Sequence, residues 1–331
     1  MKDYIPPFTI TSKMVDYISS IMEKIGKLDN YVNYNKMPLL RKNNRIRSIH
    51  SSLAIEANSL SFNQVKDVIN DRTIIGPQKE IQEVKNAYKA YEMINDVNPY
   101  SISDLKKIHG VMTYLIVNES GDFRKGNEGV FDENGNCIHI CPSPEQVNVL
   151  MNQLFDWMKR RKSDIHPLIL SSVFHYEFVF IHPFEDGNGR TARLWQNVIL
   201  SGWKGLFEYL PIESALKKYQ YGYYKAFADC NKTGDCTIFI EFMLKMIDEV
   251  LEELINTSSV PITENAININ KLLDVMEYNV PMTANEIMNK LGIRSKETLR
   301  STYLDPAIKE KLVALTIPDK PTRRNQMYYK I

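Results

Sequence analysis

Apolar residues recur at helical spacing along most of the chain. At positions i, i+3, i+4 and i+7 they form the continuous stripe that an amphipathic helix buries. This spacing predicts helices over residues 12–28, 83–97, 103–117, 145–158, 167–181, 189–200, 213–230 and 237–255. We therefore expect a mainly α-helical fold.

One interval departs from helical spacing. Residues 126–144 are rich in glycine and asparagine, and they place Asn134 and Gly135 between two short β-prone pieces. An Asn-Gly pair in this position is a strong signal for a tight turn between antiparallel strands. The pattern predicts a β-hairpin on the helical body.

A change of composition separates the end of the chain from the rest. Residues 256–265, NTSSVPITEN, are typical of a linker in their serine, threonine, asparagine and proline content. We therefore expect three parts: an N-terminal helical region over 1–97, a core over 98–256 and a C-terminal domain over 257–331.

The C-terminal domain has its own order of elements. The pattern predicts a helix over 265–276, a short helix from Thr283, a turn at Gly292, a helix over 296–303 and strands over 312–318 and 326–331. Thr283 and Glu286 have the spacing of a capping box. Helix, turn, helix and hairpin are the layout of a winged helix-turn-helix, a small α+β domain.

Composition indicates a globular protein. The chain has 331 residues, 44% hydrophobic and 24% charged, enough for two or three cores. No apolar run approaches the roughly 20 residues needed to span a bilayer, and the first residues lack the hydrophobic segment of a signal peptide. We expect a cytoplasmic protein without membrane contact.

The cysteines suggest no metal or disulfide site. The chain contains Cys137, Cys141, Cys230 and Cys236, at spacings that match no zinc module. Free thiols in a reducing compartment are expected.

The segment HPFEDGNGRTAR, from His182 to Arg193, concentrates reactive groups between two predicted helices. Gly187 and Gly189 permit positive φ and close approach of a ligand. The helix that follows begins with free N–H groups and the positive end of its dipole. This combination is typical of a phosphate-binding turn.

Charged side chains extend the same site. Arg190 and Arg193 lie three positions apart, so both guanidinium groups can reach phosphate oxygens. Asp186 is a hard oxygen ligand suited to Mg²⁺ on a polyphosphate, and His182 is a candidate general base. Each element alone is common, but together they predict a nucleotide polyphosphate site. The spacing is that of neither a P-loop nor a dinucleotide fold.

This segment resembles the signature of the Fic (filamentation induced by cAMP) family, HxFx(D/E)GNGRxxR. The matching residues are His182, Phe184, Asp186, Gly187, Asn188, Gly189, Arg190 and Arg193. The resemblance extends over about residues 100–255, including GDFRKGN at 121–127. It implies a mostly helical protein adenylyltransferase, which transfers AMP from ATP to a hydroxyl group of a target protein.

The resemblance also implies roles for these residues. His182 would take the proton from a serine, threonine or tyrosine hydroxyl, and Asp186 would hold Mg²⁺ across the α- and β-phosphates. The remaining phosphate contacts would be Gly187, Asn188 and Gly189 for the α-phosphate, Arg190 for the β-phosphate and Arg193 for the γ-phosphate.

Further positions are implied less directly. Tyr223 and Asn231 match positions that line the adenosine pocket in this family, and Phe184 would be buried to anchor the loop. The hairpin at 127–140 corresponds to the family's flap, which aligns a target segment by strand addition. We expect His139 to be an ordinary exposed histidine of this hairpin.

An acid far upstream belongs to the same resemblance. Ser52 and Glu56 lie at i and i+4 in SSLAIEANSL, residues 51–60, which by itself indicates a helix with one solvated glutamate. The family's inhibitory motif (S/T)xxxE(G/N) implies instead that Glu56 pairs with Arg193 and keeps the γ-phosphate out. Ala57 replaces the usual Gly or Asn, so the helix is expected to end later than in relatives.

Several alternatives stay open. The net charge is +1, but residues 285–331 hold ten Lys and Arg against five Asp and Glu, which weakly favours DNA binding by the winged helix. The chain could then be a DNA-binding regulator with a vestigial Fic core. It could also transfer another nucleotide, remove AMP, modify itself or form a homodimer, and the sequence does not identify a target.

Overall fold

The computed structural model describes residues 4–31, 38–131, 137–258, 264–276, 280–310, 312–320, 323 and 325–330. The chain divides into two compact units. One contains Met1–Lys27 and Asn43–Glu253, and the other contains Leu28–Lys42 and Leu254–Ile331. Most of the predicted N-terminal region therefore shares a unit with the predicted core.

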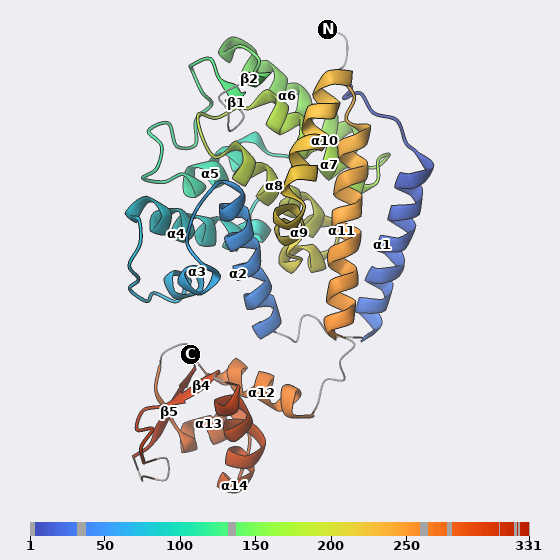
Figure 1. Ribbon diagram of the computed structural model, residues 1–331. Helices are drawn as coiled ribbons and strands as arrows, with labels where there is room; N and C mark the ends of the chain where they lie inside the picture. The colour runs from blue at the N-terminus through green and yellow to red at the C-terminus, as the bar shows by residue number, and fades with distance from the viewer. Residues whose placement is uncertain are drawn as a thin grey trace. The chain divides into compact units, whose positions relative to one another are not determined.

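Helices dominate the first unit (Figure 1). They are α1 (Ser12–Tyr31), α2 (Pro38–Ile55), α3 (Phe62–Ile69), α4 (Gln78–Glu92), η2 (Ile94–Asp96), α5 (Ile102–Met112), α6 (Pro144–Arg161), α7 (Pro167–Ile181), α8 (Asn188–Trp203), η3 (Gly205–Tyr209), α9 (Ile212–Lys218), α10 (Gln220–Thr233) and α11 (Thr237–Ser258). The predicted mainly α fold is confirmed. Among the described residues, no helix combines the length and apolar character needed to cross a bilayer.

Helices α7 and α8 form the centre of this unit. Helix α7 is apolar on nearly all sides and is buried along almost its whole length, as expected of a helix inside a core. The ring of Phe174 contacts Phe178 and Trp195 of α8, with centroids 5.5 and 6.5 Å apart. All three side chains are fully buried. The short loop between α7 and α8 therefore has two rigid supports.

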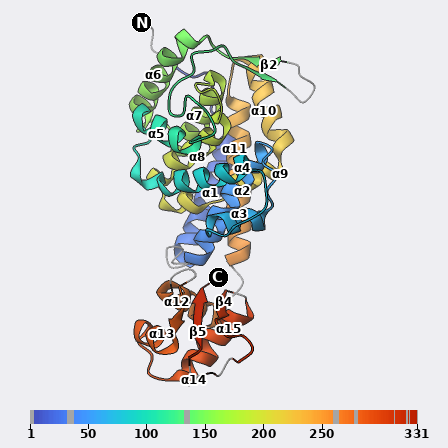
Figure 2. The ribbon, with the colours of Figure 1, turned by 90° about the vertical axis from the view of Figure 1, so that its left-hand side faces the viewer.

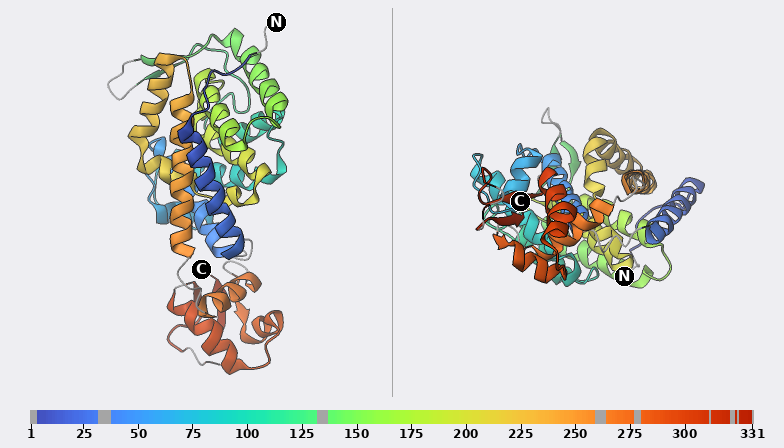
Figure 3. Two further views of the ribbon diagram at one scale, coloured as in Figure 1. Left: turned by 90° about the vertical axis from the view of Figure 1, so that its right-hand side faces the viewer. Right: turned by 90° about the horizontal axis from the view of Figure 1, so that it is seen from below.

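Helices α1 and α11 lie side by side at one face of the unit (Figures 1 and 3). Lys24 Nζ of α1 lies 2.9 Å from Asp248 Oδ1 and 3.1 Å from Glu252 Oε2 of α11. Ser20 Oγ donates to the same Asp248 oxygen at 2.7 Å. Polar contacts thus fasten the first helix to the last helix of the unit.

The predicted hairpin forms at the edge of the helical body (Figure 2). Strands β1 (Gly129–Phe131) and β2 (Cys137–Ile140) pair antiparallel, with Val130 opposite His139. The predicted turn at Asn134 and Gly135 lies outside the described residues.

The prediction for His139 was wrong. Its ring is half-buried against Phe180 of α7, with centroids 4.7 Å apart, and Nε2 lies 2.8 Å from the Phe180 carbonyl oxygen. Because this oxygen can only accept, Nε2 donates the hydrogen bond. The side chain attaches the flap to α7.

One predicted helix is two helices. The apolar spacing over 213–230 continues through a break at Tyr219, which has φ −108° and ψ 34° and separates α9 from α10. Both helices bury residues on the side that the spacing marks, so the spacing gave no sign of the break. The described cysteines, Cys141, Cys230 and Cys236, are buried.

The second unit has a core of its own. Its elements are α12 (Glu264–Val275), β3 (Met282–Thr283), α13 (Ala284–Leu291), α14 (Lys296–Thr298), η4 (Leu299–Leu304), α15 (Asp305–Lys309), β4 (Val313–Leu315) and β5 (Met327–Lys330). The strands form an antiparallel sheet in the order β3-β5-β4. Leu272, Ile287 and Leu299 lie in the core between helices and sheet.

The local signals in this unit were informative. The capping box of Thr283 and Glu286 is confirmed, and Gly292 ends α13 in the left-handed conformation. The helix predicted over 296–303 continues to Lys309, because Pro306 sits in the first turn of α15, where proline is tolerated. The order of elements agrees with a winged helix, and the DNA-binding role remains a prediction.

Candidate active site

The loop between α7 and α8 carries the signature residues. Pro183 disfavours helical backbone at the residue before it. His182 has φ 51° and ends α7 by donating its N–H to the Phe178 carbonyl at 3.0 Å. Gly187, the N-cap of α8, has φ 80°, and a Cβ there would meet Thr113 Cγ2 at 2.8 Å. Both conformation and space therefore require glycine at this position.

Asn188 holds the loop closed. Its Nδ2 donates to the Phe184 carbonyl at 2.7 Å, and its Oδ1 accepts from the Phe184 N–H at 3.0 Å. The side chain is buried and engaged by the loop itself. The backbone N–H lies in the first turn of α8, where no intrahelical acceptor exists, so it is suited to an anion.

His109 of α5 packs against the loop and supports it. Its ring stacks on Phe184 with centroids 3.6 Å apart and planes 5° from parallel. The Gly121 N–H donates to Nδ1 at 3.0 Å, so Nε2 carries the proton and donates to the Asp186 carbonyl at 2.8 Å. Burial lowers the pKa of His109 to about 4, which keeps the ring neutral. The predicted burial of Phe184 is confirmed.

Arg124 secures the other side of the loop. This buried guanidinium donates from Nε to the His182 carbonyl at 2.7 Å, from Nη1 to Gly126 at 2.7 Å and from Nη2 to Pro142 at 2.6 Å. Its own N–H donates to the Pro183 carbonyl at 2.9 Å. One side chain therefore joins the end of α7 to both ends of the flap segment.

The ring of His182 is suited to accept a proton. Burial lowers its pKa to about 4; the Val179 carbonyl opposes this shift, and the charge of Arg124 adds to it. Nδ1 lies 3.4 Å from the Val179 carbonyl oxygen. Since that oxygen can only accept, the contact favours a proton on Nδ1 and a free lone pair on Nε2.

Asp186 and Arg190 form an ion pair at the start of α8. Arg190 Nη2 lies 3.0 Å from Asp186 Oδ1, while Nη1 lies 3.2 Å from Glu83 Oε1 of α4. Burial raises the pKa of Asp186, but Arg190 and the Gly187 N–H outweigh it and the net pKa is lowered. Asp186 is therefore a carboxylate at neutral pH.

The donor set agrees with a magnesium ion bound partly by phosphate. Among the described residues, no three His, Cys, Asp or Glu side chains gather as a metal site. Mg²⁺ usually takes one or two carboxylates and completes its shell with phosphate oxygens and water. The Asp186 side chain is 47% exposed and fits that role.

Arg193 is bound by the upstream segment, as the resemblance implied. Nη2 lies 2.7 Å from Glu56 Oε1 and donates to the Ser52 carbonyl at 3.0 Å, while Nε donates to Ser52 Oγ at 3.0 Å. The Arg193 side chain is 1% exposed. Its Nη1 has no hydrogen-bond partner in the described part of the chain.

Glu56 also covers the glycine turn. A Cβ built on Gly189 would collide with Glu56 Oε1 and would lie 3.1 Å from Arg193 Nη1. The carboxylate thus lies directly over the backbone where a phosphate was predicted. An anion and the Glu56 carboxylate compete for the same space and the same cation.

Helix α2 ends immediately before Glu56, so Ala57 does not prolong it. The helix stops at Ile55, and Ala57 takes φ 65°. The Ala57 N–H donates to Ala54 and the Asn58 N–H to Leu53, at 3.4 and 3.1 Å. These two bonds form a Schellman motif. Tertiary contacts of the loop overcome the preference of alanine for helix.

Three side chains of α9 and α10 hold the end of α2. Lys217 Nζ donates to the Ala54 carbonyl at 2.8 Å. Gln220 Nε2 and Tyr224 OH donate to the Ile55 carbonyl at 3.3 and 3.4 Å. Carbonyl groups that a helix end leaves unpaired are satisfied in this way.

Tyr223 and Asn231 of α10 both contact α7. Tyr223 is 2% exposed, and its hydroxyl lies 2.8 Å from His175 Nε2. Burial raises its pKa, and the neighbouring charge of Arg193 opposes this shift. Asn231 Oδ1 accepts from Tyr176 OH at 2.8 Å. Their assignment to an adenosine pocket remains a prediction.

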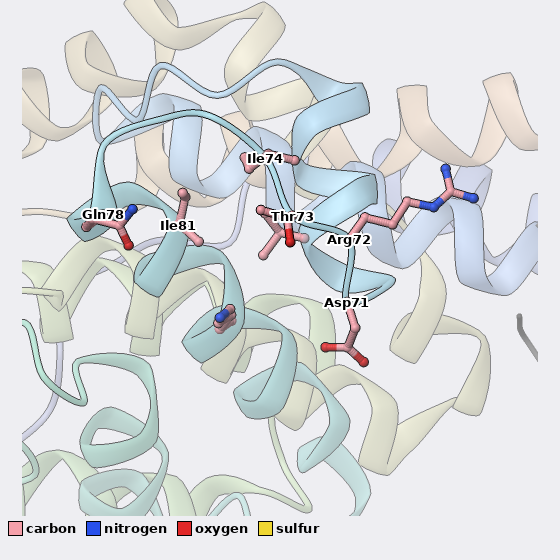
Figure 4. A pocket seen from close by; sticks show the side chains of 8 residues that line it. Asp71, Arg72, Thr73, Ile74, Gln78 and Ile81 are labelled. Atoms are coloured by element: carbon pink, nitrogen blue, oxygen red, sulfur yellow. The ribbon is translucent and has the colours of Figure 1, made fainter.

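A separate cavity of about 230 Å³ lies beside the start of α4 (Figure 4). Asp71, Arg72, Thr73 and Gln78 are among its lining residues. The signature residues contribute nothing to its lining.

Sequence reasoning found the loop but not its supports. It missed His109, Arg124 and Glu83, which lie 58 to 107 positions away from their partners in the α7–α8 segment. Only Arg124 had a sequence signal, as part of GDFRKGN. The fold and the loop define a helical protein built around a glycine-rich helix N-terminus of a shape suited to an anion.

Comparison with known proteins identifies the family. The chain is 37% identical to a Fic family protein from Desulfovibrio desulfuricans G20 of known crystal structure, with a TM-score of 0.75, and the match covers 99% of this chain and 98% of the other. Residues 99–200 match the Fic/DOC family, and residues 268–330 match the C-terminal domain of Fic-like proteins. The chain belongs to the Fic family.

Curated relatives cover part of the chain. It is 28% identical over 218 residues to the protein adenylyltransferase Fic of Aedes aegypti, which covers 62% of this chain and 41% of the relative. It is 27% identical over 265 residues to the protein of the same name from Nematostella vectensis, covering 76% and 58%. The chain thus spans about half the length of the curated relatives it matches.

Proposed function

We propose that the chain is an autoinhibited protein adenylyltransferase that transfers AMP from ATP to a serine, threonine or tyrosine hydroxyl. The observation that carries this proposal is the contact of Glu56 with Arg193 over Gly189. It joins a phosphate-binding turn to a carboxylate that competes with phosphate. The names of the curated relatives support the same reaction.

The transfer is a displacement at the α-phosphorus. Nε2 of His182 accepts the proton of the target hydroxyl, the hydroxyl oxygen forms a bond to the α-phosphorus, and the bond to the β-phosphate bridging oxygen breaks. Pyrophosphate leaves and AMP remains on the target. Transfers of this kind depend mainly on positioning and on stabilisation of charge.

The remaining groups position the nucleotide. The N–H groups of Gly187, Asn188 and Gly189 face the α-phosphate, and Arg190 and Arg193 bind the β- and γ-phosphates. Mg²⁺ bound through Asp186 would neutralise charge on the phosphates.

Access of the target is assigned to the flap. Strand β2 ends at Ile140, whose side chain is 81% exposed, and an extended segment of the target can add to the edge of the hairpin. The same route allows a second copy of the chain to be the target, so self-modification and a transient homodimer belong to this proposal. Cytoplasmic localisation belongs to it as well.

The test is transfer of label from α-labelled ATP. We expect weak labelling by the wild type, strong labelling by Glu56→Gly and none by the double variant Glu56→Gly, His182→Ala. The double variant should still bind ATP with magnesium in calorimetry. If Glu56→Gly binds no ATP, the enzymatic proposal fails.

Two alternatives are tested by the same assay. Labelling from α-labelled GTP, CTP or UTP in preference to ATP would assign another nucleotide. Loss of label from a pre-labelled target, dependent on Glu56, would indicate removal of AMP.

A vestigial core with a DNA-binding role is not favoured, because the signature residues are intact. In addition, the exposed residues from α14 to α15 carry both signs of charge, with Lys296 and Arg300 beside Glu297 and Asp305.

A further inference from the structure

A second carboxylate engages the other arginine of the site. Arg190 Nη1 lies 3.2 Å from Glu83 Oε1, and the two side chains are 4% and 13% exposed. Glu83 belongs to α4, 107 positions before Arg190. Buried charges of this kind interact strongly, and without Glu83 the Arg190 guanidinium would keep only its contact with the half-exposed Asp186.

The same glutamate holds the loop that carries Glu56. Asn58 Nδ2 donates to Glu83 Oε2 at 2.8 Å, and Asn58 Oδ1 accepts from the Leu60 N–H at 3.1 Å. Asn58 is 8% exposed. Its amide therefore closes the turn with one atom and reaches Glu83 with the other.

A parallel contact attaches Ser59, the next residue, to α4 and involves no residue of the candidate active site. Both the N–H and the Oγ of Ser59 donate to Glu80 Oε2, at 2.7 and 2.8 Å. Asn58 Nδ2 also donates to the Glu80 carbonyl at 3.3 Å. Asn58 and Ser59 thus both attach the loop after α2 to α4, and of these contacts the one between Asn58 and Glu83 leads on to Arg190. The two ties allow attachment of the loop to be separated from its effect on the arginine.

We propose that Glu83 is a positioning residue that couples the two arginines. It keeps the Arg190 guanidinium turned toward α4 and, through Asn58, keeps Glu56 over Arg193. Release of one ion pair weakens the other, so the sites for the β- and γ-phosphates open together. That this opening admits ATP rests on the proposed function. The coupling between the two ion pairs is a property of the fold and does not depend on it.

The test compares Glu83→Gln, Asn58→Asp and Ser59→Ala in the full chain. Glutamine keeps the shape of residue 83 without its charge. Aspartate at 58 keeps the acceptor for Leu60 but places a negative charge against Glu83. For both variants we expect KM for ATP to fall about tenfold, the scale of one charge-assisted hydrogen bond, with kcat within about twofold of wild type.

Hydrogen exchange provides a readout without nucleotide. In Glu83→Gln and Asn58→Asp, the amides of residues 56–60 should exchange about tenfold faster than in wild type. Ser59→Ala, which removes the hydroxyl bond to Glu80 and leaves only the backbone N–H bond, should leave KM unchanged. Melting temperatures confirm that each variant is folded.

The outcomes separate the two proposals. If Glu83→Gln leaves both KM and exchange as in wild type, or lowers kcat more than about tenfold at constant KM, the coupling is overturned. If Glu56→Gly binds no ATP but Glu83→Gln still accelerates exchange at 56–60, the coupling stands and the enzymatic proposal falls. A fall of KM in Ser59→Ala equal to that in Asn58→Asp would also overturn it, because attachment alone would explain the effect.

Discussion

Glu56 Oε1 lies 2.7 Å from Arg193 Nη2, although the two residues are 137 positions apart in the chain. The pair lies over Gly189, the residue whose missing side chain leaves room for the carboxylate. One contact therefore removes a cation from the anion site and fills the space beside it. The strength of this contact depends on Ser52, which also binds Arg193, and on the backbone conformation of Ala57 at the end of α2.

Ser52 provides a second hold on the arginine. In Ser52→Ala, Nε of Arg193 loses its acceptor in a fully buried position while the backbone contact at residue 52 remains. We expect the free energy of unfolding to fall by about 1–3 kcal/mol, and transfer to rise less than in Glu56→Gly.

Urea denaturation and labelling from α-labelled ATP measure the two effects. Ser51→Ala is the matched control, because Ser51 Oγ contacts Ser214 at 3.2 Å and not the arginine. Equal labelling by Ser51→Ala and Ser52→Ala would show that the serine does not act through Arg193.

The backbone at Ala57 stores strain. Its φ of 65° lies in the left-handed region, which costs an L-residue about 1–2 kcal/mol and glycine almost nothing. Ala57→Gly should raise the free energy of unfolding by about 1 kcal/mol and should not increase transfer, because the inhibitory loop becomes easier to form.

Ala54→Gly is the opposing control. Ala54 is the second-last residue of α2, where glycine lowers stability by up to about 1 kcal/mol. Urea midpoints for the two variants should move in opposite directions from wild type. Movement in the same direction would contradict a left-handed conformation at residue 57.

The sequence and the fold contribute different parts of this account. The signature loop, α7 and the inhibitory pair could be predicted, because each depends on local spacing or on a recognisable motif. The supporting contacts of Glu83, His109 and Arg124 could not, since a charged or histidine residue looks the same in the sequence whether it faces solvent or a buried partner, even where, as at Arg124, its segment matches the family. The conformation of Ala57 could not be predicted for a related reason: propensity favours helix at this residue, and only the tertiary contacts of the loop decide against it.

The protonation of His182 predicts the pH profile of transfer. With a pKa lowered to about 4 by burial, the ring is neutral and able to accept a proton throughout the range above pH 5. Transfer by Glu56→Gly at saturating ATP should therefore change little between pH 5.5 and 8. Initial rates in a series of buffers at constant ionic strength measure this, and loss of half the rate near pH 6.5, the ordinary value for histidine, would contradict the burial.

Glu177 of α7 predicts a pH dependence of stability that is separate from activity. This side chain is 3% exposed, and it accepts a hydrogen bond from the hydroxyl of Tyr4 in the segment before α1. Burial raises its pKa to about 7, and the Tyr4 hydrogen bond opposes that shift. A carboxyl whose pKa is raised in the folded state stabilises the fold fully below its unfolded pKa, and this stabilisation is lost as the pH rises through 7.

Glutamine at this position resembles the protonated acid at every pH, so the comparison isolates the titration. Between pH 6 and pH 8, the free energy of unfolding of Glu177→Gln relative to wild type should rise by about 1 kcal/mol. Urea denaturation of both proteins at pH 6, 7 and 8 measures the difference, in which the contributions of the histidines cancel.

Glu241→Gln is the matched control: Glu241 also binds the N-terminal segment, through Thr11 and Lys13, but its pKa is lowered. The difference in unfolding free energy between Glu241→Gln and wild type should therefore stay constant over this range. If the difference for Glu177→Gln is constant as well, the Glu177 carboxyl is ionised throughout and water reaches it.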